Sequence, residues 1–123
     1  MTTTHDIQGV CLCGAISFRH RAAETLVSCN CEACRRYRTL WAHGDLPDIE
    51  IREDGPAIRF ARTDGDGDLY FVSCAACGVT THWESVDPKS TRRAVNAALC
   101  PPDQIKDMRL RHFDGADSWT FLD

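Results

Sequence analysis

Eight cysteines are the residues of this 123-residue chain with the most distinctive chemistry, and seven of them fall into three short motifs. The motifs are CxCG at residues 11–14, CxCxxC at residues 29–34 and CxxCG at residues 74–78. In a secreted protein, eight cysteines would suggest four disulfides, but residues 1–8 contain no apolar run typical of a signal peptide. We therefore expect a cytoplasmic protein, in a reducing compartment where thiols stay free to bind metal.

The first and third motifs predict a closed zinc site. Zinc prefers four thiolates in a tetrahedron, a turn can aim two of them at one ion, and glycine after the second cysteine lets the backbone fold beneath the metal. Such a site would cross-link the start of the domain to its middle and supply folding free energy, so we expect it to be structural. Disulfides or scattered buried thiols are the alternatives. The four predicted ligands are Cys11, Cys13, Cys74 and Cys77.

The second motif predicts an open zinc site. Cys29, Cys31 and Cys34 lie within six residues, so their thiols can reach one face of a metal ion, and no fourth cysteine is near them in the sequence. Three protein ligands and one exchangeable position are what catalytic zinc requires. Water, hydroxide or a substrate thiolate would take the fourth position. We therefore expect two zinc ions per chain, one structural and one catalytic.

Other interpretations of this motif stay open at the level of sequence. A fourth ligand from the same chain would make it a second structural zinc site, and the candidates are Cys100, His43, His82 and His112. Alternatively, Cys31 and Cys34 form a redox pair, although the βαβ pattern that usually accompanies such a pair is absent. Cys100 itself has no partner motif and is expected to be a small buried hydrophobe.

Two arginines follow the open site directly. Arg35 and Arg36 would offset the negative charge of a three-thiolate zinc complex or bind the carboxylates of an acidic ligand. The alternative is that both are solvated surface residues. Zinc deprotonates a bound thiol, so the site would hold a substrate thiolate beside a small electrophile such as an aldehyde.

Short strands separated by turns must position these motifs. The sequence predicts a single mainly β domain over residues 1–123 with little helix. Residues 31–37 are expected to form one or two helical turns, and residues 93–99 fit either a strand or a helix. The predicted strands are 7–11 and 15–19 (a hairpin), 26–29, 40–43, 49–52, 57–61, 69–72 and 79–83, with 108–113 and 119–122 as a closing strand pair.

Charge and hydropathy exclude two classes of partner. The net charge of −4 and pI near 5.7 leave no basic face for nucleic acid or a membrane surface. No window approaches the roughly 18 apolar residues of a membrane span. The acidic run at residues 64–68 is interpreted as a solvated hairpin turn, because Leu69 and Ala75 stand where a calcium-binding EF-hand loop needs Gly and Glu.

The order and spacing of the three motifs resemble the glutathione-dependent formaldehyde-activating enzyme family, the group that includes centromere protein V. The matching segments are GVCLCG at residues 9–14, CNCEACRR at residues 29–36 and FVSCAACG at residues 71–78. Arg111, His112, Phe113 and Trp119 also resemble the final strands of that family, so the resemblance spans residues 9–119. One difference is Asn30, at a position where many members carry histidine.

The resemblance implies a β-tent zinc fold, in which small antiparallel sheets fold over a structural zinc. Position by position, the four paired cysteines match the structural ligands, and Cys29, Cys31 and Cys34 match the ligands of the catalytic zinc. The implied activity is that of a carbon–sulfur lyase or synthase. Glutathione adds reversibly to formaldehyde and gives S-(hydroxymethyl)glutathione.

Three rival functions remain at this stage. The first is a non-enzymatic zinc-binding module with two structural zincs that docks a partner. The second is a methionine sulfoxide reductase. Both zinc turns of such an enzyme are CxxC, whereas the first pair of this chain is CxC, and Cys100 lacks the aromatic and arginine neighbours that the catalytic cysteine of a reductase needs. The third is a redox sensor that uses Cys31 and Cys34.

Overall fold

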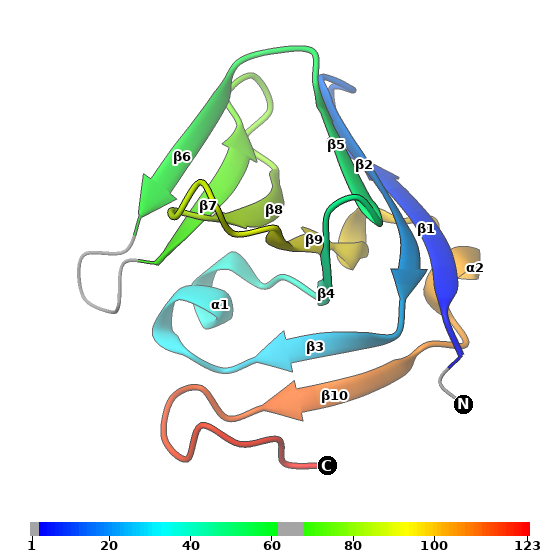
Figure 1. The fold of residues 1–123 in the computed structure, drawn as a ribbon, viewed down its shortest axis with the longest axis vertical. Helices are drawn as coiled ribbons and strands as arrows, with labels where there is room; N and C mark the ends of the chain where they lie inside the picture. Colours follow the sequence, from blue (N-terminus) through cyan, green and yellow to red (C-terminus); the bar gives the residue numbers. More distant parts are fainter. Residues whose placement is uncertain (1–2, 62–67) are drawn as a thin grey trace.

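The structure, a computed structural model, describes residues 3–61 and 68–123. Strands dominate it, which confirms the prediction of a mainly β fold (Figure 1). The strands are β1 (His5–Val10), β2 (Ile16–Ala23), β3 (Thr25–Cys29), β4 (Trp41–Asp45), β5 (Ile49–Glu53), β6 (Ala57–Ala61), β7 (Leu69–Cys74), β8 (Thr80–Ser85), β9 (Arg92–Asn96) and β10 (Arg109–Phe113). The helical segments are α1 (Glu32–Tyr37), the 3₁₀ turn η1 (Ala97–Leu99) and α2 (Pro102–Ile105).

The strands form two sheets that lean against each other (Figure 1). The small sheet has the order β1-β2-β5, and the large sheet has the order β10-β3-β4-β9-β8-β7-β6. At the top of Figure 1, β5 leads over from the small sheet into β6, the edge strand of the large one. Helix α1 lies on the inner side of the curved large sheet, beside β3.

One strand pair departs from the antiparallel arrangement of the others. Strand β10 runs parallel to β3, and the pairing continues from Arg109 opposite Thr25 to Phe113 opposite Cys29. Of the predicted closing strand at residues 119–122, only Phe121 pairs, through a single bridge to Phe113. A parallel pair needs a long connection, and here residues 30–108 lie between the two strands. The C-terminal residues are thereby brought beside the cysteine motif that ends β3.

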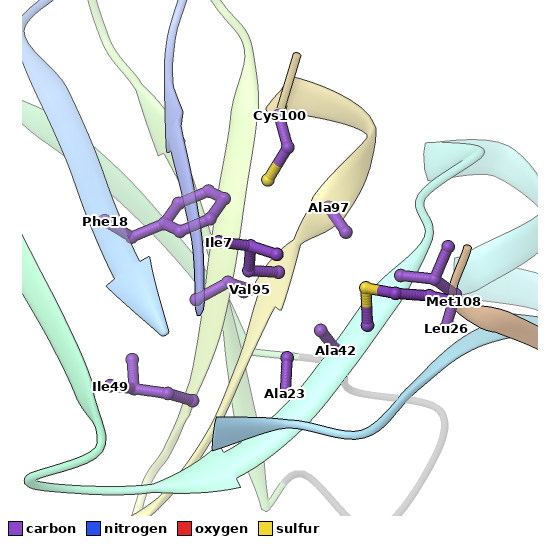
Figure 2. Close-up of a cluster of buried hydrophobic side chains, with 10 residues drawn as sticks. All are labelled: Ile7, Phe18, Ala23, Leu26, Ala42, Ile49, Val95, Ala97, Cys100 and Met108. Carbon is purple, nitrogen blue, oxygen red and sulfur yellow. The ribbon is translucent and has the colours of Figure 1, made fainter. Parts of the chain in front are cut away.

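The main core lies between the small sheet and the centre of the large one (Figure 2). Strand β2 has the alternating pattern of a half-buried strand, with Ile16 and Phe18 buried and Ser17 and Arg19 facing outward. Ile7 packs into the same core, as Figure 2 shows, together with Cys100. Burial raises the pKa of the Cys100 thiol to about 11, and its place in the core agrees with the predicted role of a small hydrophobe.

Candidate metal centres

Both cysteine turns of the predicted closed site meet in space. The sulfurs of Cys11, Cys13, Cys74 and Cys77 all lie within 4.8 Å of one another. Cys13 Sγ is 3.7 Å from Cys11 Sγ and 3.5 Å from Cys74 Sγ. A tetrahedral zinc with sulfurs at about 2.3 Å requires sulfur–sulfur distances of about 3.8 Å. The cluster therefore has the size that a four-thiolate zinc site needs.

The two turns are built alike, although they belong to different sheets. In each, the first cysteine donates its backbone N–H to a carbonyl five residues on, Cys11 to Ile16 and Cys74 to Val79, both at 2.9 Å. The glycines that follow the second cysteines, Gly14 and Gly78, have φ of +89° and +80°. Only glycine adopts this conformation without strain, so the predicted reason for glycine at both positions holds.

The thiols of this cluster have unequal pKa values, although they lie close together. Hydrogen bonds, first from the Val79 N–H, lower the pKa of Cys77 to about 6. Cys13 also accepts an N–H, from Ala15, but the neighbouring sulfurs, Cys74 first, raise its pKa to about 11. Four thiolates this close together repel one another, so they ionise together only around a positive ion. The donor set fits zinc.

The three sulfurs of the second cluster also converge. Cys29 ends β3, Cys31 is the residue that caps α1, and Cys34 lies within that helix. Their Sγ atoms lie within 4.8 Å of one another. The turn supplies two of the hydrogen bonds, from the Cys31 N–H to Cys29 Sγ (3.5 Å) and from the Cys34 N–H to Cys31 Sγ (3.3 Å). The predicted helical turns at residues 31–37 are confirmed as α1, and their function is to aim these sulfurs at one point.

Two further N–H donors reach this cluster from distant parts of the chain. Trp41 Nε1 donates to Cys34 Sγ at 3.3 Å, and the Gly115 N–H donates to Cys29. A hydrogen bond from Cys34, together with those from the Cys31 and Gly115 backbone N–H groups, lowers the pKa of Cys29 to about 5, whereas the pKa of Cys34 is raised. Hydrogen bonds of this kind orient metal ligands and stabilise their charge. The three-cysteine cluster is thus compatible with zinc.

Asn30, between two of these cysteines, clamps the C-terminal turn onto the cluster. Its side-chain Nδ2 donates to Asp114 Oδ1 and its Oδ1 accepts the Ala116 N–H, both at 3.0 Å. A Cβ on Gly115 would stand 2.8 Å from Cys29 Sγ, so the backbone of the turn passes directly over the sulfur. Asn30 therefore helps to fix one wall of the site.

The cluster opens into a cavity of about 810 Å³ on the inner face of the large sheet. Aromatic rings make up much of its wall, and those that line it are Trp41, Phe71, Trp83, Phe113, Trp119 and Phe121. Tyr37 of α1 stacks on Phe71 with ring centroids 4.9 Å apart, which holds the helix against the sheet. The site is thus an apolar pocket with three thiols in its lining.

The polar groups of the pocket differ from those that the sequence pointed to. Arg35 and Arg36 are exposed and do not line the cavity, whereas Arg92 and His43 do. Desolvation by the walls, and then the charge of Arg92, lower the pKa of His43, so its imidazole is neutral at pH 7. No sequence motif surrounds Arg92, and it reaches the pocket only because β9 pairs with β4.

Within residues 3–61 and 68–123, none of the predicted fourth ligands joins the three cysteines. Cys100 lies in the main core, and His82 is buried with its Nδ1 2.8 Å from the Thr81 hydroxyl. His112 Nδ1 lies 2.8 Å from Asp123 Oδ2. His43 lines the pocket, but its ring nitrogens are outside the cluster.

We expect Trp41→Phe to weaken zinc binding at the three-cysteine cluster by about tenfold, in line with the loss of other hydrogen bonds to metal ligands. Phenylalanine preserves most of the packing of this buried ring and removes the N–H that reaches Cys34. Competition with a chromogenic chelator measures the change. Trp83→Phe, in the same pocket but with no bond to sulfur, is the control, and equal losses in the two variants would contradict the assignment.

These features define a class: a small mainly β protein with two cysteine clusters that can each hold a metal ion. Residues 6–108 match the family described as glutathione-dependent formaldehyde-activating enzyme. The chain therefore belongs to this family, which is named as a family of enzymes, and the resemblance inferred from the motifs is confirmed.

Two further comparisons concern the fold and the sequence. The fold is similar to the crystal structure of a Rhodobacter sphaeroides protein solved by structural genomics, with a TM-score of 0.64. The two chains are 21% identical, and the match covers 84% of this chain and 98% of the other, so the likeness shows a shared fold. No curated protein matches the chain in sequence. Among the described residues, no helix is long and apolar enough to cross a membrane.

Proposed function

We propose that the protein is a zinc-dependent carbon–sulfur lyase that adds a thiol such as glutathione, reversibly, to formaldehyde or another small aldehyde. One observation carries this proposal. The cluster of Cys29, Cys31 and Cys34 lines a cavity of about 810 Å³, and no fourth side chain of the described residues completes it. Family membership supports the same reaction. In this proposal, the four-cysteine cluster is structural.

The reaction makes simple demands on the chain. A sulfur–carbon bond forms, the carbonyl π bond breaks, and the thiol proton ends on the carbonyl oxygen, so no oxidant or reductant is needed. Zinc, when bound by the three cysteines, supplies the positive charge that keeps a substrate thiol deprotonated near neutral pH. The aromatic walls exclude water and hold thiol and aldehyde together, which favours addition through proximity.

The chain also keeps the three sulfurs in place while a ligand enters. Amides of the α1 turn, the Trp41 indole and the Gly115 N–H all point at sulfur, so the cysteines do not need to rearrange. Because His43 is neutral, Arg92 alone among the described lining residues offers a permanent positive charge.

Zinc content and adduct exchange, measured on wild type and Cys31→Ser, test the proposal. We expect two zinc ions in the wild type and one in the variant, with the fold intact. Exchange NMR at equilibrium should show that the wild type accelerates the interconversion of glutathione, formaldehyde and their adduct. The acceleration by the variant should be smaller by a factor of at least about ten.

Cys100→Ser is the matched control, because it removes a thiol from the core and leaves both clusters untouched. It should keep two zinc ions and the full acceleration. A single zinc ion in the wild type, or no acceleration by the two-zinc protein, would overturn the proposal.

A further inference from the structure

Arg92 occupies a distinctive position at the start of β9. Its guanidinium lies over the ring of Trp83, 5.9 Å from the centroid, and both residues line the pocket. Across the described residues it makes no ion pair with a carboxylate. An arginine held on an aromatic face keeps its planar set of N–H donors available for a carboxylate.

The other charges of the pocket confine an anion to this end. Glu32 and Asp68, which also line it, are acidic. His43, whose ring packs edge-on to Trp83 at 5.7 Å, is neutral. A carboxylate that enters the pocket is therefore attracted to Arg92 and repelled elsewhere.

The sheet register sets the distance from the cysteines to this anion position. Trp41, which contacts Cys34, is followed along β4 by His43 and then Asp45, the partner of Arg92. A strand rises about 3.4 Å per residue, so His43 and Asp45 lie about 7 and 14 Å beyond Trp41. Trp83, whose ring lies under the guanidinium, is level with His43, because both residues pair with Ala94 of β9.

This distance selects the length of the ligand. An extended peptide covers at most about 3.6 Å per residue, so two to four residues are needed to span the gap of about 7–14 Å. A single amino acid or a short mercapto acid, with sulfur and carboxylate a few bonds apart, is too short to reach both ends.

We propose that Arg92 anchors a carboxylate of the thiol ligand, and that it thereby favours thiols whose carboxylate lies well apart from the sulfur over thiols that lack one. The proposal rests on the proposed function, since it places the ligand sulfur at the three-cysteine cluster. Arg92 thereby acts as a specificity-determining residue of the pocket, in the role first considered for Arg35 and Arg36.

Binding measurements on the zinc-loaded protein test this assignment without relying on activity. Calorimetry gives the dissociation constants of glutathione, a peptide thiol with remote carboxylates, and of 2-mercaptoethanol, a thiol with none. We expect Arg92→Gln to weaken glutathione binding by about tenfold, the size expected for a charged hydrogen bond, and to leave 2-mercaptoethanol unchanged. Arg92→Lys should fall between, and Arg35→Gln, outside the pocket, should match the wild type.

The outcomes separate the two proposals. If neither thiol binds, the proposed function fails and Arg92 fails with it. If both thiols bind and Arg92→Gln changes neither, or weakens both equally, the anchor is overturned while the thiol site stands. Cobalt-substituted protein gives a second readout, because a thiol that reaches the metal changes its visible absorption whether or not Arg92 contributes.

Discussion

Replacing Cys74 by serine is expected to prevent the protein from folding at ordinary temperatures. Cys74 is fully buried at the end of β7, and its sulfur lies 3.5 Å from that of Cys13. Zinc binding by structural cysteine sites in small domains contributes about 10–16 kcal/mol, whereas a whole domain is stable by about 5–15 kcal/mol. Losing one ligand of this cluster therefore removes free energy comparable to the entire stability. Near-UV circular dichroism and thermal unfolding measure the effect.

Variants of Cys77 distinguish whether the loss of stability comes from the lost metal or from the lost cysteine side chain. Cys77, in the same cluster but only half-buried, can be changed to histidine, which still binds zinc. We expect Cys77→His to fold with zinc and Cys77→Ser to fail as Cys74→Ser does. A Cys74→Ser protein with wild-type thermal stability would show that this cluster is not the structural site.

Changing Gly115 to alanine is expected to empty the three-cysteine cluster while leaving the fold in place. The added Cβ would lie 2.8 Å from Cys29 Sγ, closer than a Cβ approaches other atoms in proteins, and 3.2 Å from Cys31 Cβ, which is tighter than most such contacts. Relieving an overpacked contact costs about 1–3 kcal/mol, and here the sulfur must move to relieve it. Zinc affinity at this cluster should fall by about ten- to a hundredfold, measured as zinc retained after dialysis against a chelator.

Ala116→Ser is the matched control for this prediction. It alters the next residue of the same turn, which is exposed. The control should retain two zinc ions, and Gly115→Ala should retain the one held by the four-cysteine cluster. Unchanged zinc retention in Gly115→Ala would mean that the turn yields freely, and that its N–H is not a support for Cys29.

The local parts of both clusters were predictable because their information is local. A cysteine turn with glycine behind it, or three cysteines at the start of a short helix, depends on a few consecutive residues, and the structure builds these turns as the spacing suggested. Residues 93–99 fitted two patterns because both are present. Strand β9 ends at Asn96, whose side chain accepts the Ala98 N–H and caps the 3₁₀ turn.

The walls of the pocket were not predictable because they depend on strand order. Arg92 reaches the pocket through the pairing of β9 with β4, and Gly115 through the parallel pairing of β10 with β3. Neither pairing leaves a periodic pattern in a single sequence, and β3 and β10 are separated by most of the chain. Arg35 and Arg36 were candidates because they follow the cysteine motif directly in the sequence, but they face solvent.

The two clusters lie in different parts of the molecule, so the residues around each of them can change at different rates in evolution. The four-cysteine cluster joins the small sheet to β7, near one edge of the large sheet, whereas the three-cysteine cluster belongs to β3 near the other edge. If the four-cysteine cluster is the structural site, as proposed, substitutions around the second cluster leave that source of stability unchanged. Within such a scaffold, the residues of the pocket wall are free to diverge, and one set of zinc turns can serve many different ligands.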